Sequence, residues 1–369
     1  MLEVAEIIRL HGAAYRAQVG DRLLPSHARA MRDLEQCRTA YFGGHRAQCD
    51  HCARQVSIYH SCGNRHCPKC HRNQTERWLE QQRARLLPCP YYLLTFTLPS
   101  ELRALARAHQ RVIYGLLMQC AAAALQKLAR DPRYLGARLG ALGVLHTWTR
   151  ALLYHPHVHF LVTAGGLSAD GAQWIAPRHP AFLVPVEALS VIVRAKICAA
   201  VKKAGLLGQV PSTVWKKPWV VQCQPAGQGL QVLEYLGRYV FRIAISNSRI
   251  ERIEDGQVTF RYRDNRSQQM RRVTLSGLEF LARFLQHVLP RGCTKVRYYG
   301  IWSSARRTDL DQARALLSAP LSSGTAASIP VVAVPDLPAR PPTPSLCPHC
   351  RVGQLIVIDV LRPQRKVPP

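Results

Sequence analysis

Two cysteine pairs near the N-terminus limit most strongly how this chain can fold. Cys49 and Cys52 are separated by two residues, and so are Cys67 and Cys70. A Cys-x2-Cys turn brings two thiolates to one side of an ion, and two such turns complete a tetrahedral Zn²⁺ site. The surrounding segment is too short and polar to bury a core, so bound metal would supply most of its folding free energy. We therefore expect these four cysteines to bind one structural zinc ion.

Further cysteine and histidine side chains could complete a second zinc site close by. They are Cys37, His45, Cys62 and His66. A third pair, Cys347 and Cys350, lies near the C-terminus, where no second cysteine pair lies close to it in the sequence. That pair would need ligands from elsewhere in the chain or from a second subunit, or it binds no metal.

The composition indicates a globular protein with a polyanionic partner. The chain has 369 residues, a hydrophobic content of 47% and a net charge of +28 with a pI near 10.2. This charge favours a polyanionic partner such as nucleic acid. No stretch approaches the roughly 20 consecutive apolar residues that span a bilayer, and no signal peptide is evident at the N-terminus. We therefore expect a cytoplasmic protein without a membrane partner, whose 13 cysteines stay reduced.

The order of predicted elements indicates an α+β fold, with an antiparallel sheet flanked by helices. The expected strands cover residues 91–98, 142–151, 157–163 and 219–224, and the expected helices cover 1–36, 100–130, 186–204 and 229–241. Four regions follow along the chain. They are a helical and zinc-binding domain (1–88), the main α+β domain (89–310), a proline-rich linker (311–346) and a C-terminal tail with a cysteine pair (347–369).

Two histidines on one predicted strand form a candidate metal site. His157 and His159 flank Val158 in an apolar run, and alternation along a strand places both imidazoles on the same face. Imidazoles at this spacing can bind one divalent ion. Three residues are candidates for a third ligand, with the first favoured: His146, Gln222 and Gln224.

Two tyrosines at helical spacing form the second half of this candidate site. Tyr235 and Tyr239 are four residues apart, on one face of a predicted helix. Arg238 and Arg242 each follow a tyrosine by three residues and could clamp phosphate, or could simply be solvated. The tyrosines could equally pack at the edge of an amphipathic helix. A metal pocket facing two tyrosines is suited to cutting and rejoining DNA through phosphotyrosine.

These motifs resemble those of the HUH endonucleases, and most closely the two-tyrosine transposases of the insertion-sequence ninety-one family. The likeness extends to Cys62–Cys70, His146–Trp148 and Ala244–Asn247. It implies a ferredoxin- or RRM-like palm, a catalytic Mg²⁺ or Mn²⁺, and an N-terminal zinc-binding domain. It also implies rolling-circle transposition, in which a tyrosine nicks single-stranded DNA and becomes joined to the 5′-phosphate.

Two other functions remain open. One is a plasmid replication initiator or relaxase with the same chemistry, and the other is a non-catalytic zinc-dependent DNA-binding protein. The expected partners are single-stranded or hairpin element ends and target DNA in a bacterial nucleoid, and the protein could self-associate. Five aromatic residues are expected to stack on bases: Trp215, Trp219, Tyr298, Tyr299 and Trp302.

Overall fold

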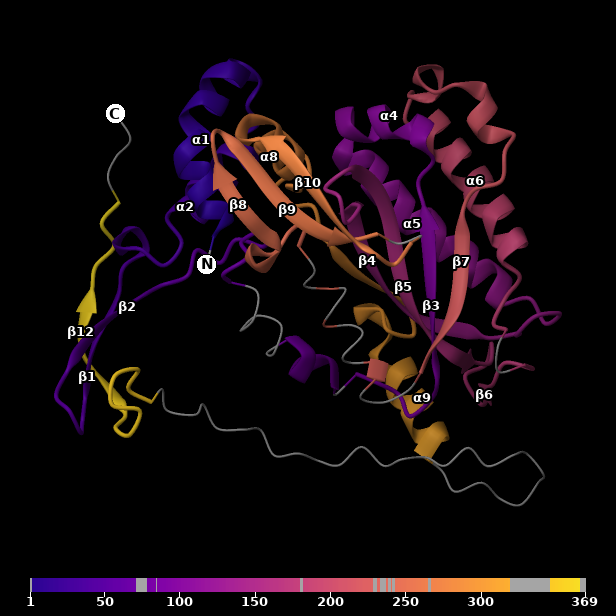
Figure 1. Cartoon of the computed structure of the whole chain (residues 1–369). Helices are drawn as coiled ribbons and strands as arrows, with labels where there is room; N and C mark the ends of the chain where they lie inside the picture. The colour runs from indigo at the N-terminus through magenta and orange to yellow at the C-terminus, as the bar shows by residue number, and fades with distance from the viewer. Residues whose placement is uncertain are drawn as a thin grey trace.

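The largest sheet, called the central sheet below, is antiparallel and lies on the right of the molecule in Figure 1. The computed structural model describes residues 2–70, 78–83, 85–179, 182–227, 231–232, 237, 240, 243–264, 267–318 and 346–365. The strand order is β11-β4-β5-β3-β7, and β6 pairs with β5. These strands span Tyr91–Thr97 (β3), Arg138–Trp148 (β4), Tyr154–Leu167 (β5), Trp174–Ile175 (β6), Val221–Gly227 (β7) and Val296–Gly300 (β11). The central strand β5 is therefore held on both sides, by β4 and β3.

Helices pack on both faces of this sheet. The helices concerned are α4 (Arg103–Ala108), α5 (Gln110–Ala129), α6 (Val186–Lys203) and, on the second face, α9 (Arg307–Ser318). Val158, Phe160 and Val162 of β5 are fully buried in the core that contains α5 and α6. Side chains alternate along a strand, so the intervening residues of β5 point to the second face, where Leu161 packs with Val144.

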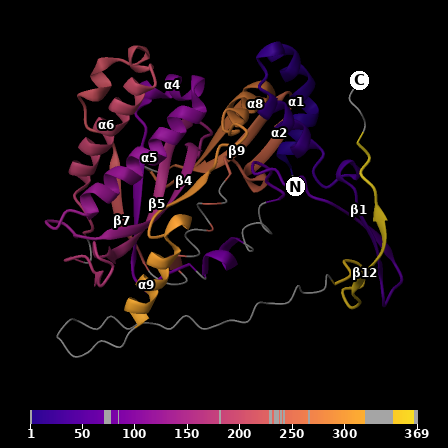
Figure 2. The same ribbon diagram turned by 180° about the vertical axis from the view of Figure 1, so that it is seen from behind.

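A second core forms beside the central sheet, between the N-terminal helices and a smaller sheet (Figure 2). Its elements are α1 (Val4–Val19), α2 (Pro25–Glu35), β8 (Ile250–Glu254), β9 (Gln257–Arg263), β10 (Met270–Ser276) and α8 (Gly277–Leu285). Asp255 and Gly256 turn β8 into β9 with φ angles of 50° and 71°, as expected for an Asp-Gly hairpin. Phe260 and Phe280 fill the interior, and Trp148 at the end of β4 joins the same core.

A third sheet brings the two ends of the chain together. It contains β1 (Gly44–Cys49), β2 (Gln55–Tyr59) and β12 (Leu355–Leu361) in the order β12-β1-β2. Both pairings are antiparallel, and Figure 1 shows the yellow C-terminal strand beside the N-terminal β1. The C-terminal tail is therefore part of the N-terminal sheet.

The predicted α+β class, with antiparallel sheet and flanking helices, is confirmed. Two long predicted helices are each divided. The first breaks at Gly20, which has a φ of 55°, before Pro25 starts α2, and the second breaks at His109. Short 3-10 helices link other elements at Gly20–Arg22, Ala40–Phe42, Ser100–Leu102, Leu207–Gln209, Ser212–Trp215, Asn247–Arg249 and Ser304–Arg306.

One described helix, α5, has the length and apolar composition of a membrane span, which the sequence analysis did not count. However, 61% of its apolar stretch is buried inside the protein. It packs against α6 and β4 in the main core, as expected for the core helix of a folded domain.

Candidate functional site

Three histidines project from the second face of the central sheet. His157 of β5 lies directly opposite His146 of β4 in the strand register, and His159 follows two residues later. The ring centroids of His146 and His159 are 4.9 Å apart, as are those of His157 and His159. One nitrogen from each ring lies within 4.8 Å of the others. The structure thus brings together His157, His159 and the favoured third candidate, His146.

Hydrogen bonds fix the orientation of two of these rings. His157 Nδ1 donates to the carbonyl oxygen of His155 at 2.6 Å, which leaves the lone pair of a neutral imidazole on Nε2. His159 Nδ1 lies 2.9 Å from Oγ1 of Thr95, its cross-strand neighbour on β3. Such second partners set the tautomer and orientation of metal-binding histidines. The local hydrogen bonds therefore suit rings that present Nε2 to an ion.

The other two candidates for the third ligand lie on a strand that is not adjacent to β5. Gln222 and Gln224 lie on β7, where Gln222 pairs with Thr95. Because β3 separates β7 from β5, these glutamines are about 10 Å from β5 across two strand spacings. His155 is also outside the cluster, and its Nδ1 accepts a 2.8 Å hydrogen bond from Arg103.

A lysine lies beside the histidines, although sequence reasoning did not identify it. Trp148 stacks on His146 with a centroid distance of 4.8 Å, and Lys295 Nζ lies 5.2 Å from the centroid of the Trp148 ring. The same ammonium donates to the carbonyl oxygen of Val240 at 2.8 Å. Lys295 is about 150 positions from His146 in the sequence, and only the pairing of β11 with β4 brings it here.

The predicted nucleophiles Tyr235 and Tyr239, together with Arg238 and Arg242, lie outside the described residues. The structure does describe two residues that flank this segment in the sequence. Val232 and Val240 are both buried, and both pack in the cluster that contains Leu161 and Val144. This is the sheet face from which the three histidines project.

The aromatic residues predicted to stack on DNA bases differ in how far they are buried. Trp219 and Trp302 are buried in the two cores of the central sheet. Trp215 stacks on Trp219 with a centroid distance of 5.8 Å, and Tyr298 and Tyr299 are partly buried against the same cores. Trp219 and Trp302 are therefore too buried to stack on bases. Trp215, Tyr298 and Tyr299 keep part of their surface exposed, and base stacking by these three stays a prediction.

The structure also groups the N-terminal cysteines differently from the sequence-based pairing. Cys67 and Cys70 gather with Cys37 and Cys62, not with the pair at Cys49. The Sγ atom of Cys70 lies 3.5 Å from those of both Cys37 and Cys62. A tetrahedron with metal–sulfur bonds of about 2.3 Å has edges of about 3.8 Å, so this four-sulfur group has approximately the dimensions of a zinc site.

Cys49 and Cys52 gather instead with Cys347 and Cys350. The expected mixed site of Cys49, Cys52, Cys67 and Cys70 is thus corrected by the structure. The Cys-x2-Cys pattern identifies each knuckle, whereas the choice of partner knuckle depends on strand pairing far along the chain.

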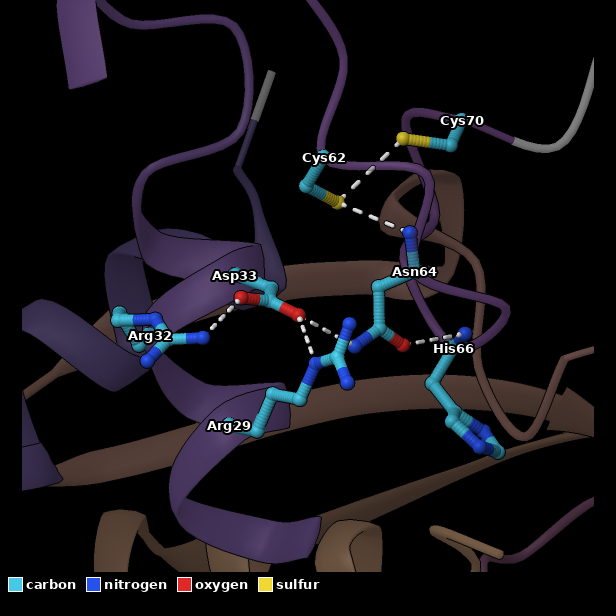
Figure 3. Close-up of polar contacts among 7 residues, drawn as sticks. All are labelled: Arg29, Arg32, Asp33, Cys62, Asn64, His66 and Cys70. Atoms are coloured by element: carbon cyan, nitrogen blue, oxygen red, sulfur yellow. Dashed lines mark hydrogen bonds and ion pairs between the residues drawn. The ribbon is translucent and has the colours of Figure 1, made fainter. Parts of the chain in front are cut away.

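The two histidines expected to help bind a second zinc are engaged elsewhere. His45 Nε2 lies 3.0 Å from His60 Nε2. His66 Nε2 accepts a hydrogen bond from the backbone N–H of Leu289 at 3.3 Å, and its ring points away from Cys62 and Cys70 in Figure 3. Both candidates are therefore outside the cysteine groups.

A buried carboxylate supports the first cysteine group from α2 (Figure 3). Asp33 accepts a hydrogen bond from Asn64 Nδ2 at 3.1 Å and pairs with Arg29 and Arg32 at 3.4 and 3.0 Å. The Asn64 backbone N–H in turn donates to the sulfur of Cys62 at 3.4 Å.

Comparison with known proteins agrees with this arrangement. Residues 140–309 match a family model described as a putative transposase, and residues 7–98 match a transposase zinc-binding domain. The putative transposase y4qJ of Sinorhizobium fredii is 41% identical over 382 residues, covering 97% of this chain and 95% of that protein. The transposase for insertion sequence element IS801 of Pseudomonas savastanoi pv. phaseolicola is 32% identical over 304 residues, covering 73% and 70%.

No solved structure matches the chain. The putative transposase y4qJ nevertheless matches nearly the whole chain, and the two regions matched by family models contain the histidine cluster and the first cysteine group. The chain belongs to the IS91 family of insertion-sequence transposases, which carry an N-terminal zinc-binding domain.

Proposed function

We propose that this transposase nicks and rejoins single-stranded DNA at the ends of its element, through a tyrosine nucleophile, during rolling-circle transposition. The observation that carries the proposal is the cluster of His146, His157 and His159 on the sheet face that also carries Leu161 and Val144. The same face receives Val232 and Val240, which flank the two candidate tyrosines in the sequence. A metal site and its nucleophiles would then share one surface.

The three histidines would hold the catalytic ion. Their hydrogen bonds to the His155 carbonyl and to Thr95 suit coordination through Nε2. An all-imidazole ligand set suits a first-row transition ion better than Mg²⁺, so Mn²⁺ is favoured of the two expected ions. When bound, such an ion polarises the scissile phosphate and offsets its developing negative charge.

Tyr235 or Tyr239 would attack the phosphorus atom. A bond forms between the phenolic oxygen and phosphorus, the bond from phosphorus to the 3′ oxygen breaks, and the phenolic proton is lost as the 3′-hydroxyl is released. Because a free tyrosine has a pKa of about 10, the phenol needs a nearby positive charge as it ionises. Lys295, anchored on the Val240 carbonyl, can supply that charge, while Arg238 and Arg242 would bind the phosphate.

The phosphotyrosine linkage would conserve the energy of the cleaved phosphodiester bond for the rejoining step. A 3′-hydroxyl can attack the phosphorus and release the tyrosine, so strand transfer needs no nucleotide cofactor. Two tyrosines allow two transfers in sequence, which suits the movement of one strand from donor to target. This arrangement favours a transposase with two nucleophiles over a single-turnover nuclease.

DNA binding would use the basic surface and the zinc-binding region. The net charge of +28 favours phosphate contacts in a nucleoid-associated, cytoplasmic protein. We assign DNA cleavage to residues 89–310 and DNA contact chiefly to residues 1–88. The predicted linker at 311–346 overlaps the end of α9, which packs on the central sheet as far as Ser318, so we place the linker to the tail at 347–369 after that helix. Self-association is compatible with the need to hold two element ends.

Cleavage of end-labelled single-stranded DNA that carries the element terminus tests this function. We expect nicking with Mn²⁺ or Mg²⁺, none with EDTA, and none in His157→Ala or His159→Ala. The matched control is His179→Ala, a change of an exposed histidine outside the three clusters, which should retain nicking. Cleavage by the histidine variants at the wild-type rate would refute the proposed metal site.

The same assay separates the two alternative functions. A replication initiator would cleave a plasmid origin and ignore the element ends. A non-catalytic DNA-binding protein would bind the terminus tightly and leave it intact with every ion.

A further inference from the structure

A second four-cysteine group joins the two ends of the chain. It consists of Cys49 at the end of β1 and Cys52 just after it, together with Cys347 and Cys350 before β12. The matched zinc-binding region ends at residue 98 and the matched transposase region at residue 309, so neither includes the C-terminal pair. We propose that these four cysteines form a second zinc site, which fastens the C-terminal tail to the N-terminal domain.

The sulfur positions have the dimensions of a metal site. Cys49 Sγ lies 3.7 Å from Cys350 Sγ, and Cys52 Sγ lies 3.8 Å from Cys347 Sγ. The edge of a tetrahedron with zinc–sulfur bonds of about 2.3 Å is about 3.8 Å. A disulfide would bring two sulfurs to about 2.0 Å, so the arrangement suits four thiolates around one ion.

The backbone of both knuckles is shaped around the sulfurs. Cys49 Sγ accepts hydrogen bonds from the backbone N–H groups of His51 and Cys52, both at 3.4 Å. Cys350 Sγ likewise accepts one from Gly353 at 3.4 Å. These donors stabilise thiolate charge, as expected of metal-binding cysteines.

Left-handed residues mark both knuckles in the same place. Ala53 follows Cys52 with a φ of 55°, and Arg351 follows Cys350 with a φ of 57°. This conformation is unfavourable for residues other than glycine and persists only where the surroundings impose it. In the first cysteine group Arg38 follows Cys37 with a φ of 60°. The repeated pattern indicates that the turn conformation serves the sulfur position.

The two knuckles fit closely against each other. A Cβ atom on Gly353 would lie 2.5 Å from Cys49 Sγ, so only glycine allows the tail knuckle to approach. The backbone N–H of Gln354 donates to Asp50 Oδ1 at 2.8 Å, and the Asp50 N–H donates to the Gln354 carbonyl at 3.1 Å. These contacts position the tail at the point where β12 begins to pair with β1.

Little hydrophobic burial holds the tail in place. Ile356, Ile358 and Val360 of β12 are 56%, 47% and 65% exposed, so the strand depends on its backbone pairing with β1. A single strand pairing without a buried face is weak in water. An ion bound by two ligands from each side would supply the missing stabilisation.

Zinc content tests the proposal in the full chain. The background carries His157→Ala and His159→Ala, so that only cysteine sites retain metal. We expect about two zinc ions per chain in this background and about one after Cys347→Ala with Cys350→Ala. Cys49→Ala with Cys52→Ala should cause the same loss, and all four changes together should still leave about one ion. Cys198→Ala with Cys223→Ala, outside both groups, is the matched control and should leave about two.

A second measurement keeps the proposal testable if a variant folds poorly. A protease site inserted between residues 319 and 345 allows the tail to be cut from the folded, zinc-loaded protein. The tail fragment should co-elute with the remainder and separate when Cys347 and Cys350 are changed to alanine. Two results would overturn the proposal. One is that the Cys347→Ala, Cys350→Ala variant retains two zinc ions. The other is that the cut wild-type tail separates while the remainder keeps both ions.

Discussion

The Thr95→Val substitution offers a test of how the sheet prepares the histidines for metal. Thr95 Oγ1 lies 2.9 Å from His159 Nδ1, and the two residues are direct cross-strand neighbours. Valine has nearly the same shape and keeps the β3 backbone pairing, so the change removes one hydrogen bond and leaves the strand in place. The affected property should be the metal affinity of His159, not the folding of the sheet.

The expected size follows from the energy of one hydrogen bond. A net contribution of about 1.4 kcal/mol corresponds to a factor of about ten, and loss of an outer partner of a metal-binding histidine costs roughly 10- to 100-fold in affinity. The half-saturating Mn²⁺ concentration for DNA nicking should therefore rise about tenfold. The maximal rate at saturating Mn²⁺ should stay close to that of the wild type, because no group that touches DNA has changed.

Thr97→Val is the matched control. Thr97 lies opposite His157 in the same register, but His157 Nδ1 is held by the His155 carbonyl. This variant should keep the wild-type dependence on Mn²⁺. Equal half-saturating concentrations in the Thr95 and Thr97 variants would show that the Thr95 hydrogen bond does not orient a metal ligand, and the reasoning would fail.

Three further outcomes follow from the structure. Burial lowers the pKa of His287 from 6.5 to about 3, so the unfolded state binds a proton that the folded state excludes. Stability should be full above the unfolded pKa and fall as the pH drops toward the folded value, with a loss of about 2 kcal/mol by about pH 5. Urea unfolding at about pH 5 and at a pH well above 6.5 measures this difference. His287→Gln should reduce the loss of unfolding free energy at the lower pH. Gly353→Ala should weaken zinc binding at the tail site, because the added carbon would lie 2.5 Å from Cys49 Sγ. Gly208→Ala is the control, since its added carbon meets nothing within 4 Å and zinc affinity should not change. A competition titration with a chelator compares the zinc affinities of the two variants. Affinity for single-stranded DNA should fall steeply with salt, with a log–log slope steeper than about −3 for a protein that contacts several phosphates; a nearly flat plot from fluorescence anisotropy would exclude the electrostatic binding surface.

Local pattern was sufficient to predict the histidine cluster. The apolar run around Val158 indicated a strand, and alternation placed His157 and His159 on one face. His146 lay on the preceding predicted strand, and antiparallel pairing of neighbouring strands then brought it opposite His157. Each step used residues close in the sequence.

The partners of the cysteine knuckles could not be predicted in the same way. Cys49 lies 301 positions from Cys350, and nothing in the spacing of Cys49 and Cys52 distinguishes a nearby knuckle from a distant one. The pairing of β12 with β1 determines that Cys49 and Cys52 meet the C-terminal knuckle. Lys295 was missed for the same reason, since its place beside Trp148 depends on the pairing of β11 with β4. The available signal was the number of cysteines, because three knuckles with Cys37 and Cys62 suffice for two four-sulfur sites.

The central claim is that a tyrosine becomes joined to DNA. The most direct measurement incubates the protein with 5′-end- and 3′-end-labelled terminus DNA and Mn²⁺, then isolates protein–DNA adducts under denaturing conditions and maps the modified residue by mass spectrometry. We expect a metal-dependent adduct on Tyr235 or Tyr239 that carries the 5′-phosphate, and no adduct when both are changed to phenylalanine. An adduct that persists in the double variant, or nicked DNA without any covalent protein, would contradict the proposed mechanism.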